Sequence, residues 1–307
     1  MEIRTVALIG AGAIGGYFIW GLAGALGDDF CVVADGARKE RLTRDGLVIN
    51  GEKAVFPVKT PEEAKGADLV LVATKYAGLP SACGEVQKIL TDQTIVISLL
   101  NGVDSEEILG DAIGKEHVVN AYMIISSEHR ENAVTFNPAV MTGLFFGERD
   151  TKEKTKRCQA LERLFARGQC RAQFVPDILS GQWQKFCRNI CYNLPQAILS
   201  VGIGAYEDSA HVMAISEDLE KEVRTVAKAC GCPIPPVRRS NMGYRKNARY
   251  STLQDLDAKR PTEVDMFCGV LMKKAEEHGI EVPVTRTVYH LIKALEEKNE
   301  GKFEYTD

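Results

Sequence analysis

The sequence has no strong excess of either charge, no paired-cysteine motif and no cluster of histidines. Lysine plus arginine number 38 against 42 aspartates and glutamates, a formal net charge of −4 over 307 residues. Nucleic-acid binders are usually strongly basic, so this balance argues against that class, although it allows a small anion in a local positive pocket. The nine cysteines contain no C-x-x-C pair and the five histidines are isolated, which argues against a metal site. So many thiols are typical of a reducing cytosol, and we expect a cytoplasmic protein.

Long linkers, internal repeats and low-complexity segments are also absent, and the length favours two domains, each with its own core. One stretch, Thr5–Gly27, carries no charge and could be read as a signal peptide or a membrane span. Seven glycines lie between Gly10 and Gly27. A strand, a glycine turn and a helix explain this stretch better, so we expect no membrane partner.

A glycine motif lies between an expected strand and an expected helix. The apolar run Ile3–Ile9 predicts a buried strand, Gly10-x-Gly12-x-x-Gly15 follows it, and a helical pattern comes next. The first glycine permits a tight turn, the second lets the backbone approach a pyrophosphate, and the third allows close packing of helix and strand. The helix N-terminus supplies free N–H groups to phosphates. Apart from a plain glycine turn, the interpretation is a dinucleotide site made by Gly10, Gly12, Ala13, Ile14 and Gly15.

An acid ends the next expected strand, "FCVVAD". Asp35 lies twenty residues past Gly15, where a carboxylate can bond the adenine ribose hydroxyls and favour NAD. Arg38, Lys39 and Arg41 follow closely and could instead bind a 2′-phosphate. The motif therefore predicts a nicotinamide cofactor and leaves NAD and NADP open.

Two further buried strands lead into polar side chains. "ADLVLVATKY" runs into Lys75, and "QTIVISLLNG" runs into Asn101. In an open parallel sheet, ligands bind beyond the carboxyl ends of the strands. Lys75 and Asn101 could each hold the nicotinamide end of the cofactor or the substrate, or each could merely end its strand.

Helical periodicity dominates after Pro176-Asp177. We therefore expect an α/β fold with a Rossmann-type doubly wound sheet over residues 1–176 and an all-helical domain over residues 177–307. A helix from about Thr151 to Arg167 is expected in the first domain. The helices expected in the second are Ile178–Leu194, Ser209–Cys230, Pro236–Arg249, Thr262–His278 and Thr285–Glu297.

The helix containing "QWQKFCRNICYNLP" carries an unusual polar stripe. Lys185, Asn189 and Asn193 are spaced by four residues and so stack along one helical face with a slow drift. Asparagine is a poor mid-helix residue because its amide competes with the backbone. The stripe indicates a site for a polar substrate, or else a lysine that snorkels over two solvated amides.

A second polar stretch, "STLQDLDAKRPTEVD", runs from Ser251 to Asp265. Thr262 is expected to cap a helix, with Asp265 three residues later in a capping box. Glu263 is then not needed for the cap, although a first-turn acid also gains from the helix dipole. Ser251 has an equally plain interpretation as an N-cap.

Five motifs together resemble the ketopantoate reductase (2-dehydropantoate 2-reductase) family over nearly the whole chain. They are "GAGAIGGYF" from Gly10, "ATKY" around Lys75, "LLNGV" around Asn101, "WQKFCRNICYN" around Lys185 and "STLQDLDAKRPTEVD" from Ser251. The resemblance implies a Rossmann domain followed by a helical domain, with the active site between them. It implies NADPH-dependent reduction of 2-dehydropantoate to (R)-pantoate, in pantothenate and coenzyme A biosynthesis.

The resemblance also implies roles for single residues. Lys185 matches the catalytic lysine, and Glu263 matches the acid that works with it beside the cofactor. Asn189, Asn193 and Ser251 match substrate-binding residues, and Lys75 and Asn101 match residues at the nicotinamide and substrate end.

Three positions depart from the family pattern. Asp35 stands where the family often has arginine, so the preference for NAD or NADP stays open. Leu194 separates Asn193 from Pro195, and Cys268-Gly269 replaces a frequent Asn-Gly. The alternatives are therefore a reductase of another small 2-keto acid, a non-catalytic dinucleotide-binding sensor, or a redox sensor using the side-by-side thiols Cys187 and Cys191. The expected partners are a small 2-keto acid and a second copy of the chain in a homodimer.

Overall fold

The computed structural model describes residues 1–237 and 245–305. The chain divides into two compact units, Met1–Leu179 and Ser180–Asp307. Among the described residues, no helix combines the length and the apolar character needed to cross a membrane.

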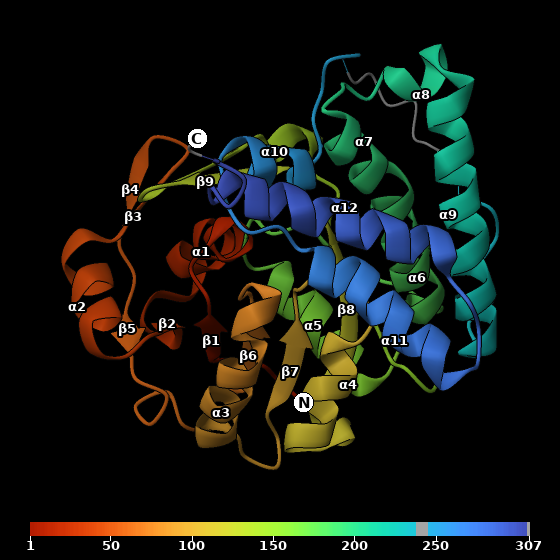
Figure 1. Ribbon diagram of the computed structural model, residues 1–307. Coiled ribbons are helices and arrows are strands. Elements are labelled where there is room, and N and C mark those ends of the chain that lie inside the picture. The colour runs from red at the N-terminus through yellow and green to blue at the C-terminus, as the bar shows by residue number, and fades with distance from the viewer. Residues whose placement is uncertain (238–244, 306–307) are drawn as a thin grey trace. The chain divides into compact units, whose positions relative to one another are not determined.

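An eight-stranded sheet forms the centre of the first unit, in the order β12-β11-β8-β7-β6-β1-β2-β5 (Figure 1). Its strands are β1 (Val6–Ile9), β2 (Phe30–Val33), β5 (Val58–Lys59), β6 (Leu69–Val72), β7 (Ile95–Ser98), β8 (Val118–Ile124), β11 (Gly143–Gly147) and β12 (Ala172–Phe174). All neighbours pair in parallel except β8 and β11. Because β1 lies between β6 and β2 and the strand order reverses there, this is the doubly wound arrangement that the glycine motif predicts.

Helices connect these strands and cover both faces of the sheet (Figure 1). They are α1 (Ala13–Leu26), α2 (Gly36–Asp45), α3 (Leu79–Ile89), α4 (Ser105–Ile113) and α5 (Lys156–Phe165), with short 3₁₀ helices η1 (Gly27–Asp29), η2 (Tyr76–Gly78), η3 (Lys115–His117) and η4 (Pro138–Val140). All residues of β1, β2, β6 and β7 are buried, as expected for strands covered on both sides.

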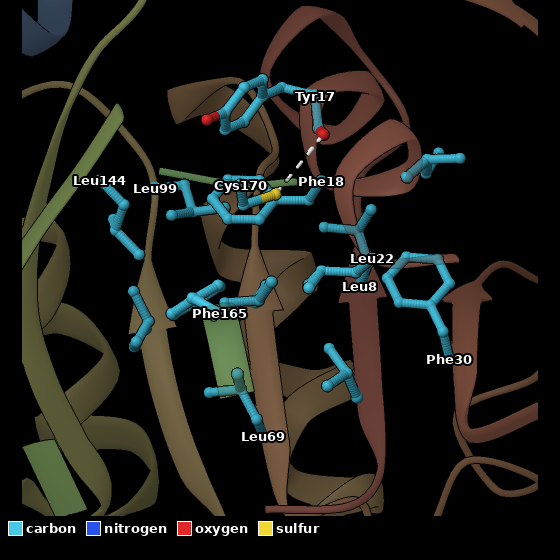
Figure 2. Close-up of a cluster of buried hydrophobic side chains, with 14 of the residues drawn as sticks. Leu8, Tyr17, Phe18, Leu22, Phe30, Leu69, Leu99, Leu144, Phe165 and Cys170 are labelled. Carbon is cyan, nitrogen blue, oxygen red and sulfur yellow. Dashed lines mark hydrogen bonds between the residues drawn. The ribbon is translucent and has the colours of Figure 1, made fainter. Parts of the chain in front are cut away.

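Alternate residues of the central strands pack into two separate cores. Leu8 belongs to the core formed with α1 and α5, whereas its neighbours Ala7 and Ile9 belong to the core formed with α3 and α4. Figure 2 shows the first core, where Phe18 and Leu22 of α1 lie beside Leu8.

The pairing of four short strands into a second sheet, in the order β4-β3-β10-β9, was not expected from the sequence. Its strands are β3 (Leu47–Ile49), β4 (Glu52–Ala54), β9 (Ser127–Arg130) and β10 (Ala133–Phe136). Asn50 and Gly51 join β3 to β4 with φ of 52° and 90°. Asn-Gly is the usual pair for such a two-residue hairpin.

The described part of the second unit contains helices and connections but no strand, which confirms the expected helical class. The helices are α6 (Ile178–Arg188), the π-helix η5 (Asn189–Asn193), α7 (Leu194–Leu199), α8 (Ala205–Asp208), α9 (Ala210–Ala229), α10 (Ser251–Asp257), the π-helix η6 (Asp265–Gly269), α11 (Val270–Glu277) and α12 (Pro283–Asn299). The long helix α12 lies against α7, α9 and α11 (Figure 1).

Two expected helices differ from the structure by about five residues at one end. The helix expected to end at Leu194 continues to Leu199 through a π segment. The helix expected from Thr151 begins at Lys156, because Thr155 caps it by accepting from the Cys158 N–H at 3.3 Å.

The prediction of a helix over Pro236–Arg249 is wrong for those of its residues that the structure describes. Its described residues, 236–237 and 245–249, are not helical, and 238–244 lie outside the described residues. The carbonyls of Lys246 and Ala248 accept hydrogen bonds from the N–H groups of Gly204 and Ile203, at 2.9 and 3.1 Å. These bonds occupy carbonyls that a helix would need for its own ladder.

Candidate active site

The central strands of the first unit end along one line. Ile9 pairs with Val33 on one side and with Val72 on the other, and Val72 pairs with Ser98. The segments that leave these strands therefore start side by side. The sequence-predicted residues that follow this line are the glycine turn from Gly10 to Gly15, Asp35, Lys75 and Asn101.

The glycine turn leaves its outer side open. Gly10 has a φ of +100°, and a Cβ on Gly15 would lie 1.9 Å from the Gly10 carbonyl oxygen. A Cβ on Gly12 would meet nothing within 4 Å. Gly12 is the N-cap of α1, and no side chain caps this end. The first and third glycines thus serve the packing of the turn, whereas the second borders open space at a helix N-terminus, where free N–H groups can bind a phosphate group.

The end of β2 presents a carboxylate. Asp35 is exposed, and its Oδ1 accepts a hydrogen bond of 2.7 Å from the Gly36 N–H at the start of α2. Burial raises the pKa of Glu85 above its usual value, Arg38 and Lys88 oppose the shift, and the charge of Asp35 adds to it. The edge beside Asp35 therefore carries charges of both signs.

One of the three basic residues that could bind a 2′-phosphate is already engaged. Lys39 forms an ion pair with Glu63, which also accepts a hydrogen bond of 2.7 Å from the Thr60 N–H. Meeting a 2′-phosphate would require Lys39 to leave this carboxylate.

A hydrogen bond joins the two loops that carry Lys75 and Asn101. Tyr76 follows Lys75, and its Oη donates to Asp104 Oδ2 at 2.5 Å. Ser98 and Ser105 flank the loop that contains Asn101, and their hydroxyls lie 2.7 Å apart. Ser105 and its neighbours open α4, so the segment containing Asn101 is held at both ends.

Thr74 was not singled out from the sequence, although it lies within the "ATKY" motif. Its Oγ1 is buried and is one of few such atoms in the described residues with no hydrogen-bond partner. Buried polar atoms in proteins are nearly always hydrogen-bonded. An unpaired hydroxyl just beyond the carboxyl end of β6 therefore fits a place where a bound molecule supplies the missing hydrogen bond.

In the second unit, Lys185, Asn189 and Asn193 share one continuous helical run. Lys185 lies in the last turn of α6, and the two asparagines are the first and last residues of η5. Four residues of α-helix turn more than a full circle, whereas four residues of a π-helix turn less. The drift between Lys185 and Asn189 is therefore opposed by the drift between Asn189 and Asn193, and the three side chains stay closer to one line than the sequence predicts.

Ser251 and Glu263 lie on segments that adjoin this run. Ser251 is the exposed first residue of α10, whose N-cap is Tyr250, so the N-cap interpretation of Ser251 is wrong. Glu263 is half-buried immediately before the helix that contains η6. Both α10 and η6 contact η5. The structure thus gathers the segments that carry the predicted residues of this unit.

The Thr262 hydroxyl accepts from the Val264 N–H at 3.3 Å, as a capping residue does, but the predicted capping box with Asp265 is wrong. Thr262 bonds Glu296 Oε1 through its N–H at 2.7 Å and its hydroxyl at 2.6 Å. Asp265 instead accepts from Tyr289 Oη at 2.9 Å and from Lys293 Nζ at 3.3 Å. Both residues are thus tied to α12, which fixes the segment that carries the intervening glutamate.

Comparisons with known proteins agree with these features. The family model described as "Ketopantoate reductase PanE/ApbA" matches residues 6–150, and "Ketopantoate reductase PanE/ApbA C terminal" matches residues 177–296. The 2-dehydropantoate 2-reductase of Archaeoglobus fulgidus is 29% identical, over 96% of this chain and 99% of its own.

Two solved structures have a similar fold. A PanE/ApbA family ketopantoate reductase from Ralstonia eutropha JMP134 is 25% identical, with a TM-score of 0.82 over 96% of this chain and 99% of its own. D-mandelate dehydrogenase, in a ternary structure with NADH and anilino(oxo)acetate, is 20% identical with a TM-score of 0.82 over the same shares.

Proposed function

The chain belongs to the ketopantoate reductase family of oxidoreductases, and we propose that it reduces 2-dehydropantoate to (R)-pantoate with a nicotinamide cofactor. A role in pantothenate and coenzyme A biosynthesis would follow from this reaction. The observation that carries the proposal is the polar line of Lys185, Asn189 and Asn193 in a chain that also has an open glycine turn.

The cofactor would be held by the first unit. The N–H groups of Gly12, Ala13, Ile14 and Gly15 would donate to the pyrophosphate, with Gly10 making the turn. Lys75 and Asn101 would bind at the nicotinamide end. The bound cofactor supplies the hydride. The exposed carboxylate of Asp35 and the ion pair of Lys39 support NADH as the preferred form, against the NADPH that the resemblance implies.

Lys185 would handle the charge that the reduction creates. Reduction of a ketone places negative charge on the carbonyl oxygen, and an ammonium beside that oxygen stabilises the charge and then donates a proton. Glu263 would hold the ammonium in place and bond a substrate hydroxyl.

Three neutral residues would orient the substrate. The amides of Asn189 and Asn193 can donate to its oxygens without adding charge, and the exposed Ser251 hydroxyl can bind its carboxylate.

Steady-state assays test the proposal. Ketopantoate and a panel of other small 2-keto acids would be compared with NADH and with NADPH, with Lys185→Ala as the control for background. The highest kcat/KM is expected for ketopantoate. Absence of ketopantoate turnover, with turnover of another 2-keto acid, would instead support the alternative reductase. One residue favours that alternative: the buried Cys268 of η6 stands where the family often has asparagine. No turnover of any 2-keto acid would support the dinucleotide-binding sensor.

A further inference from the structure

Gln196 is a buried amide with an unusual set of partners. It lies on α7 with 0% of its surface exposed. Its Nε2 donates to the Ala248 carbonyl oxygen at 3.1 Å, and its Oε1 accepts from the Tyr250 N–H at 2.7 Å. One side chain thus bonds both a carbonyl, which also accepts from the Ile203 N–H, and an N–H on the stretch of backbone that leads directly into Ser251.

Tyr206 completes a gap in the helix that carries Gln196. Its Oη donates to the Tyr192 carbonyl oxygen at 2.5 Å and accepts from the Gln196 N–H at 3.2 Å. In an uninterrupted α-helix these two backbone groups, four residues apart, would bond each other. The hydroxyl is therefore inserted into the helical ladder, which is a known cause of local helix distortion.

Two other features fit this insertion. Pro195 has no N–H, so the carbonyl of Cys191 also has no partner four residues later. Burial raises the pKa of Tyr206 above its ordinary value, which keeps the phenol protonated and able to donate. The π segment is thus completed by a side chain from outside the helix.

We propose that Gln196 and Tyr206 are positioning residues that hold Asn193 and Ser251 in register for substrate binding. Tyr206 sets the backbone of the π segment at the residue before Asn193, and Gln196 sets the backbone at the residue before Ser251. The two residues are themselves joined by the bond from the Gln196 N–H to Tyr206 Oη. The inference rests on the proposed function, because that function assigns Asn193 and Ser251 to the substrate.

Tyr206→Phe and Gln196→Met test this proposal. The first keeps the ring that packs edge-on against Tyr192, at 5.1 Å between centroids, and removes only the hydroxyl. The second keeps the volume and removes both hydrogen bonds. Each variant is expected to raise KM for the keto acid and lower kcat/KM by roughly tenfold, the size of one hydrogen bond to the substrate lost through misplacement of Asn193 or Ser251. KM for the cofactor should stay unchanged, because its predicted ligands lie mainly in the first unit.

A matched control separates positioning from stability. Thr285 is fully buried in the same unit, and its Oγ1 donates to Glu222 Oε2 at 2.7 Å. Thr285→Val should lower Tm without changing KM for the keto acid. The Tyr206→Phe, Gln196→Met double variant should lose little more kcat/KM than either single variant, because the two residues belong to one hydrogen-bonded network. Hydrogen exchange should quicken at the amides of Tyr250 and Ser251 in Gln196→Met.

The outcomes distinguish the two proposals. If the wild type reduces a 2-keto acid and both variants lower Tm as the control does while leaving KM unchanged, the positioning role is overturned and the proposed function stands. If Gln196→Met does not fold, Tyr206→Phe carries the same comparison alone. A wild type that reduces no 2-keto acid overturns the proposed function, and the positioning role with it.

Discussion

Substitution by alanine should impair different properties at Gly12 and at Gly15: cofactor binding at the first and stability at the second. A Cβ on Gly15 would lie 1.9 Å from the Gly10 carbonyl oxygen, whereas a Cβ on Gly12 would meet nothing within 4 Å. Gly15→Ala therefore requires a backbone shift, with an expected cost of about 1–3 kcal/mol. In a unit of this size, that corresponds to a fall in Tm of about 2–12 °C.

Gly12→Ala should leave the fold nearly intact and weaken the binding of the cofactor. Its φ of −89° is accessible to alanine, and the stability change should stay within about 1 kcal/mol. The added methyl group would occupy the space where the backbone approaches the pyrophosphate. Loss of one charged hydrogen bond there would raise the Kd for the cofactor by about ten- to hundredfold.

Thermal unfolding and titration with NADH and NADPH measure the two effects separately. Gly24→Ala is the matched control, because Gly24 lies in the same helix and its Cβ would also meet nothing within 4 Å. It should raise Tm slightly and leave Kd unchanged. Unaltered cofactor binding by Gly12→Ala would refute the argument, since it would mean that no phosphate approaches this turn.

Three further predictions concern charged side chains. Lys185→Ala should lower kcat by about 10²–10⁴-fold with little change in the Kd for the cofactor, and a near-normal kcat in steady-state assays would show that Lys185 is not the proton donor. Asp35→Arg should shift the ratio of kcat/KM values toward NADPH, and an unchanged ratio would mean that Asp35 does not meet the ribose. Burial raises the pKa of Glu85 in the folded state, so this carboxyl favours folding at low pH and loses that contribution as pH rises through its folded-state pKa. Glu85→Gln should therefore raise Tm at pH 7, and the gain should shrink toward pH 4; a gain independent of pH would contradict this cause.

The central sheet could be predicted because its signals are local. The short apolar runs that end at Ile9, Val33, Val72 and Ser98 each form a buried strand, and the glycine motif indicates the turn after the first. Parallel strands share one carboxyl edge, so the positions of the loops that follow could also be inferred. The roles of Lys185, Glu263 and the other site residues stay predictions, as do the domain limits and the homodimer.

The features that were missed depend on contacts between residues far apart in the sequence. β3 pairs in parallel with β10 more than eighty residues later, although the Asn50-Gly51 hairpin was a local signal that could have found its first half. The capping box failed because Glu296 binds Thr262 from another helix. Local propensity favoured each of these expectations, and tertiary hydrogen bonds decided the outcome.

The inserted hydroxyl of Tyr206 makes the geometry of this helix a property of the folded unit. A synthetic peptide covering residues 178–199 would contain Lys185, Asn189, Asn193 and Pro195 but not the group that bridges Tyr192 to Gln196. Such a peptide has no means of completing its own ladder at that point. Moving Lys185, Asn189 and Asn193 into another protein would accordingly require a tyrosine from a neighbouring element. Copying the helical segment alone would leave Asn193 on a backbone of different pitch.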